Sequence, residues 1–131
     1  METRFYTSIE ESRRLLELGL SADTADMHTE LTEEDGELIS VVTVGSGDRT
    51  KYNYGTPIWS VGALLEVMPK TIDESNETLH LDIYPATEGW FYEYGKDWEN
   101  DYSVLMGGKT QIEAAYNMVC YLLTNNHIKK G

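Results

Sequence analysis

The feature that most constrains the fold is an apolar segment near the C-terminus, residues 110–124. Thr110 and Glu113 have the spacing of a helix-capping box, and the apolar residues after them recur at helical intervals. Further apolar residues extend this surface around much of the helix: Met118, Cys120 and Tyr121. We therefore expect a helix that is packed on more than one side.

Two more helices are predicted upstream. The capping-box spacing of Thr7 with Glu10, or of Ser8 with Glu11, predicts a helix that ends near Leu18. The segment SVGALLEVMP predicts a second, short helix, because its serine is a suitable N-cap and its apolar residues recur at helical spacing.

A β-hairpin is predicted between the first two helices. Strand-like residues 28–31 and 37–44 flank the Asp35–Gly36 pair, which suits a tight turn between antiparallel strands. The polar, glycine-rich residues 45–57 that follow are typical of an extended surface loop.

Three strands are predicted between the second and third helices. Residues 79–84 alternate apolar and polar side chains, and residues 90–94 and 102–106 supply two more strands of a meander. The element order predicts an α+β fold, in which about three helices pack on an antiparallel sheet made of the hairpin and the three-strand meander. We expect residues 1–131 to form a single domain.

The chain is strongly acidic, with a net charge of -13. Residues 1–36 carry ten acidic and three basic residues, and residues 71–108 carry nine acidic and one basic residue. Such a charge repels nucleic-acid phosphates and anionic membrane surfaces, so we expect neither direct nucleic-acid binding nor membrane binding. The single cysteine, Cys120, excludes an intrachain disulfide, and no secretory leader is visible, so we expect a cytoplasmic protein.

Motifs for catalysis or for a cofactor are not apparent. Residues 107–110 read GGKT, but Ser103 stands where a phosphate-binding loop needs its first glycine. We therefore expect no cofactor and, more generally, no enzyme. One set of metal candidates consists of two pairs of residues spaced two apart on strands, which would form a cluster if the strands were adjacent: His28, Glu30, His80 and Asp82.

Aromatic residues are more numerous than the core seems to need. They gather around the middle loop and along residues 90–98: Tyr52, Tyr54, Trp59, Trp90, Tyr92, Tyr94 and Trp98. If residues 79, 81 and 83 fill the core face, some of these rings lie on the opposite face or at an edge and form a binding patch. The alternative is that the rings cap the core.

Three segments, SIEESRRLLELGLSADTADM, WSVGALLEVMP and AAYNMVCYLL followed by TNNHIKK, carry a resemblance. Across about a third of its length, the chain resembles small bacterial proteins of prophage and mobile-element type. That group has no assigned activity, so the resemblance implies an origin and no mechanism.

Three functions are compatible with these features. The first is a non-enzymatic protein-binding module of mobile-element origin, which uses the aromatic patch and its acidic surroundings to bind an unidentified protein or a second copy of itself. The second is an acidic nucleic-acid mimic that inhibits a DNA-binding protein. The third is a metal-binding protein or enzyme built on the four His and carboxylate candidates.

Overall fold

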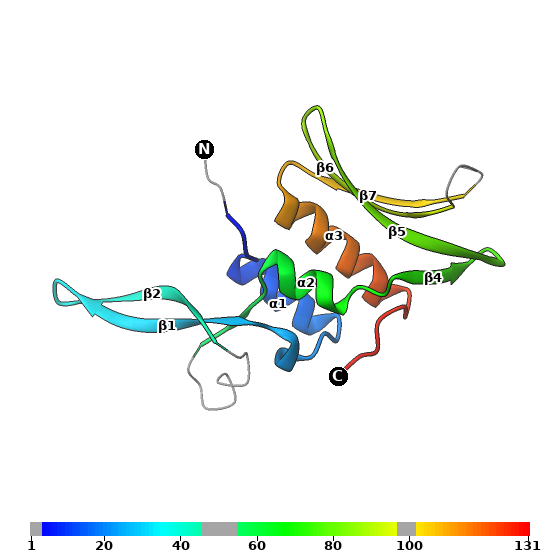
Figure 1. The fold of residues 1–131 in the computed structure, drawn as a ribbon. Helices are drawn as coiled ribbons and strands as arrows, with labels where there is room; N and C mark the ends of the chain where they lie inside the picture. Colours follow the sequence, from blue (N-terminus) through cyan, green and yellow to red (C-terminus); the bar gives the residue numbers. More distant parts are fainter. Residues whose placement is uncertain (1–3, 46–54, 97–101) are drawn as a thin grey trace.

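A computed structural model describes residues 4–45, 55–96 and 102–131. The fold is α+β: the helices lie between a projecting β-hairpin and a four-stranded sheet (Figure 1). The helical elements are α1 (Ile9–Glu17), the single 3-10 turn η1 (Ala22–Thr24), α2 (Val61–Val67) and α3 (Gln111–Thr124). The strands are β1 (Met27–Glu34), β2 (Glu37–Val44), β3 (Pro57–Ile58), β4 (Thr71–Glu74), β5 (Glu77–Ala86), β6 (Gly89–Gly95) and β7 (Val104–Gly108).

Polar side chains cap the helices as predicted. Of the two alternatives for α1, the structure has the box at Ser8, whose hydroxyl accepts from the Glu11 amide at 3.1 Å while the Glu11 carboxylate accepts from the Ser8 amide at 2.8 Å. Ser60 and Thr110 cap α2 and α3, and the hydroxyl of each accepts from the amide three residues later.

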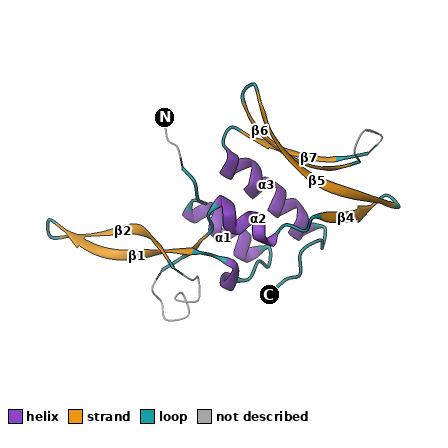
Figure 2. Ribbon diagram, viewed as in Figure 1, coloured by secondary structure: helices purple, strands orange, loops and turns teal. Residues whose placement is uncertain are grey.

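Helix α3 is the centre of the core, which confirms the prediction that it is packed on more than one side. It contacts β6 and β7 on one side and α1 and α2 on the other. Figure 2 shows the three helices gathered in one layer, with the strands outside it. Within the described ranges, no helix has the length and apolar character that a membrane crossing requires.

The C-terminal sheet has the order β4-β5-β6-β7, with every neighbouring pair antiparallel. The meander therefore has four strands, one more than predicted, because residues 71–74 pair with β5. The connecting turn is made by Ser75 and Asn76, with φ of 52° and 62°, a left-handed conformation that glycine usually adopts. Because this turn contains no glycine, the sequence does not indicate a hairpin between residues 71 and 80.

The N-terminal sheet has the order β2-β1-β3 and is separate from the first. The hairpin is confirmed, with Asp35 and Gly36 at φ of 53° and 80° in its turn. The prediction that the hairpin and the meander form one sheet is wrong, because they belong to two separate sheets. Strand β3, which begins at the last residue of the segment predicted to be a loop, pairs with the base of β1 and ties the hairpin to the helices.

Candidate functional site

The predicted aromatic patch does not form as expected. Trp59, Tyr92 and Tyr94 are fully buried in the core, so an exposed surface cannot include them. Trp90 is half-buried and packs against the core from its edge. The remaining three candidates lie outside the described residues: Tyr52, Tyr54 and Trp98.

Strand register explains why the rings of β6 point inward. Tyr94 pairs with Leu81, and Tyr92 pairs with Ile83. Directly opposite residues share a sheet face, so the tyrosines lie on the face that packs against α3. The alternative interpretation, that the rings cap the core, holds for this strand.

The four metal candidates are not brought together. His28 and Glu30 lie on β1 of the N-terminal sheet, whereas His80 and Asp82 lie on β5 of the other sheet. His28 is buried and its Nε2 lies 2.9 Å from the Glu30 carboxylate, which makes this pair an internal contact at the hairpin base. Across residues 4–45, 55–96 and 102–131, no group of three or more His, Cys, Asp or Glu side chains is arranged to hold a metal ion.

The tip of the β1–β2 hairpin is the longest uninterrupted run of exposed residues in the described structure. All residues from 31 to 38 are exposed, and the ribbon extends away from the helices (Figure 1). A two-stranded ribbon without a packed face is only marginally stable in water. An extended ribbon of this kind gains stability when another surface covers it.

The base of the hairpin is firmly held. Asp26 accepts hydrogen bonds from the amide of Ser60 at 2.9 Å and from its hydroxyl at 2.5 Å, which links β1 to the start of α2. The Thr29 amide donates to the Thr56 carbonyl at 2.9 Å beside β3. The exposed half is thus an arm of paired strands that is rooted in the fold by hydrogen bonds at its base.

The exposed half of the hairpin combines apolar and acidic side chains. Leu31 and Leu38 are each 72% exposed, and Val44 is 79% exposed. Ser40 is opposite Leu31 and Glu33 is opposite Leu38, so the two leucines share one face of the ribbon. Five acidic residues and no lysine or arginine occur between residues 27 and 44: Glu30, Glu33, Glu34, Asp35 and Glu37.

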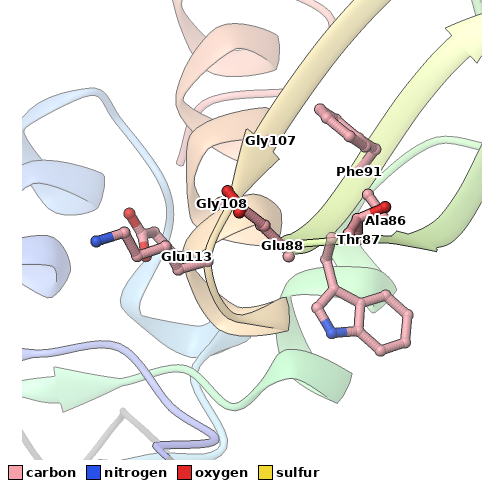
Figure 3. Close-up of a pocket in the computed structure, with 10 residues that line it drawn as sticks. Ala86, Thr87, Glu88, Phe91, Gly107, Gly108 and Glu113 are labelled. Carbon is pink, nitrogen blue, oxygen red and sulfur yellow. The ribbon is translucent and has the colours of Figure 1, made fainter.

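A second candidate surface lies where the β5–β6 turn meets the start of α3. Two adjoining hollows of about 760 Å³ each share Glu88, Trp90, Lys109 and Glu113 in their walls. Figure 3 shows the first, in which Phe91 and Glu113 lie on opposite sides of the Gly107–Gly108 segment. The four shared residues supply two carboxylates, one amine and one ring, an arrangement with no nucleophile beside a base.

The GGKT segment, residues 107–110, has a structural role in this region. Gly107 and Gly108 are the last residues of β7, and Thr110 caps α3. A Cβ atom on Gly108 would come within 2.5 Å of the Ala114 amide nitrogen, so the strand can approach the helix this closely only at a glycine.

A cluster of polar side chains surrounds Glu74 at the end of β4. Its carboxylate accepts hydrogen bonds from Tyr102 at 2.7 Å, from Tyr121 at 2.7 Å and from His127 at 2.5 Å. Burial raises the pKa of Glu74, but the three hydrogen bonds and the charge of His127 outweigh burial and bring the pKa below its ordinary 4.5. These contacts join β4 to the residue before β7, to α3 and to the C-terminal residues, so the cluster has a structural role.

Comparison of the chain with family models, with curated proteins and with solved structures finds no match.

Proposed function

We propose that this chain is a non-enzymatic protein-binding module that binds its partner through the β1–β2 hairpin. The observation that carries the proposal is the exposed, rooted arm, which has Leu31, Leu38 and Glu33 on one face and further acidic side chains, Glu34 and Glu37, on the other. Large apolar side chains within a polar rim are typical of protein interfaces. The proposed origin in a mobile element is supported by the resemblance of the sequence alone.

The partner surface that fits this arm is basic and contains apolar pockets. The acidic residues of the hairpin attract lysine and arginine side chains and raise the rate of encounter, while burial of the leucines provides affinity. A nucleic-acid mimic would need carboxylates alone, and the two exposed leucines serve no purpose in that function. Protein binding is therefore favoured over the acidic mimic.

Affinity capture from a bacterial lysate tests the proposal. The immobilised wild-type chain is compared with the double variant Leu31→Ser, Leu38→Ser and with the control Leu105→Ser, which removes an exposed leucine from β7 instead. Bound proteins are quantified by mass spectrometry. All three chains should keep their thermal stability, because surface substitutions usually change it by less than about 0.5 kcal/mol.

The expected result is a basic protein that the wild type and the Leu105→Ser control retain equally and the hairpin double variant loses. A triple variant that replaces Glu33, Glu34 and Glu37 by Gln should also weaken capture, most clearly at low salt. Capture that survives in the hairpin double variant and fails in the Leu105→Ser control would move the site to the other sheet and refute the proposal.

A further inference from the structure

The outer edge of β2 has a defined set of free backbone groups. The Gly45 amide donates to the Asp26 carbonyl at 2.8 Å, which fixes the phase of the hairpin ladder. In an antiparallel pair, successive residues direct their amide and carbonyl groups alternately toward and away from the partner strand. Counting back from Gly45, residues 43, 41, 39 and 37 therefore bond to β1. The residues between them direct their backbone groups outward: Leu38, Ser40, Val42 and Val44.

No strand among the described residues pairs with this edge, because β2 is the outermost strand of its sheet. Edge strands are usually protected by lysine, proline, a bulge or inward-pointing charge. Strand β2 reads ELISVVTV, has an unbroken register with β1 from Glu37 to Val44, and carries a single charge at Glu37. Its composition is that of a strand that is covered on both sides.

We propose that the partner covers β2 by adding an extended, basic segment as a further strand of this sheet. This inference rests on the proposed function and specifies how the same hairpin binds. Backbone hydrogen bonds at Leu38, Ser40, Val42 and Val44 provide the pairing, and the exposed side chains of Leu38 and Val44 pack against alternate residues of the added strand. A lysine or arginine in that strand next to Glu37 meets the one carboxylate that β2 supplies, and Glu33 and Glu34 add negative charge one strand further away on β1.

A proline substitution separates strand addition from side-chain contact. Ser40 is exposed and its amide is directed away from β1, so Ser40→Pro removes an outward donor and leaves the hairpin ladder intact. Ser40→Thr is the matched control, since it keeps the amide at the same position. Val42→Pro with Val42→Thr repeats the test at the next outward amide, and the amide exchange of Ile39 and Val41 reports whether each variant keeps its hairpin.

The probe is a random dodecapeptide display library selected on the wild-type chain. We expect peptides rich in β-branched residues together with lysine or arginine, whose binding weakens about tenfold or more in each proline variant and stays unchanged in each threonine control. Equal binding by the proline and threonine variants, with loss in the Leu31→Ser, Leu38→Ser variant, would refute strand addition and leave the proposed function standing.

Two other outcomes also contradict the inference that a partner's basic segment is added to β2. Peptides that bind all hairpin variants as they bind the wild type would refute both the inference and the proposed function. A wild-type dimer in sedimentation analysis that Ser40→Pro dissociates and Ser40→Thr keeps would show that a second copy of the chain, and not a partner's basic segment, occupies the edge.

Discussion

Glu74 is the side chain whose charge contributes most clearly to folding. Its three hydrogen-bond donors come from different parts of the chain, and its side chain is only 14% exposed. We expect Glu74→Gln to lower the free energy of unfolding at pH 7 by about 1.5–3 kcal/mol, the range for hydrogen bonds to a charged group. Urea unfolding measures the loss. Glu88→Gln makes the same change of charge at an exposed position and should alter stability by less than about 0.5 kcal/mol.

The pH dependence of this contribution follows from the lowered pKa of Glu74. Because the folded pKa lies below the ordinary 4.5, the folded state holds fewer protons than the unfolded state in that interval. The stabilisation is fully present above pH 4.5 and is lost as the pH falls through the folded pKa. The difference between wild type and Glu74→Gln should therefore shrink on acidification, and a difference that grows instead would contradict the assignment.

Cys120 should be a poorly reactive thiol. Its side chain packs against the core, and burial raises its pKa above the ordinary 9.0. Less thiolate is present at pH 8, and access is restricted. We expect a thiol reagent to modify the folded chain severalfold more slowly than the urea-unfolded chain, as absorbance measurements of the released chromophore would show. Equal rates would mean that the thiol is open to solvent.

At the scale of elements, two glycines have opposite predicted responses to alanine. A Cβ on Gly108 would clash with the backbone at the start of α3, so Gly108→Ala should cost about 1–3 kcal/mol. Gly62 lies in α2, where the nearest atom to an added Cβ is the Ser60 hydroxyl oxygen at 3.6 Å, so Gly62→Ala should stabilise by about 0.4–1 kcal/mol. Thermal unfolding of the pair checks both signs. Equal effects would show that the contact between β7 and α3 is looser than described.

Elements with a local signal could be predicted from the sequence. Ser60 and Thr110 mark helix starts by their own capping chemistry, and Asp35–Gly36 marks its turn by the left-handed conformation that Gly36 accepts. Strand β4 is four residues long, and the turn after it contains no glycine. It is therefore stabilised as a strand only by its pairing with β5, which comes later in the chain. Such strands depend on tertiary contacts that local patterns do not contain.

At the scale of the whole molecule, the candidate site was only half predictable. The hairpin and its acidic residues can be read from the sequence, but the exposure of Leu31 and Leu38 depends on which elements fail to cover them. Conversely, Tyr92 and Tyr94 have the composition of an interface and are buried, because register with β5 places them toward α3. The sheet face on which a side chain lies, and whether another element covers that face, are properties of the assembled sheets and not of any one strand.

The central claim is that binding occurs at the β1–β2 hairpin, and amide hydrogen exchange across the whole chain tests it most directly. The measurement compares the free chain with the chain saturated by the protein captured from lysate. Added protection should be confined to residues 31–44 and be strongest at Leu38, Ser40, Val42 and Val44, whose amides are directed outward in the free chain. Protection that appears instead around Trp90 and Lys109, with the hairpin unchanged, would contradict the claim and assign the interface to the hollow beside α3.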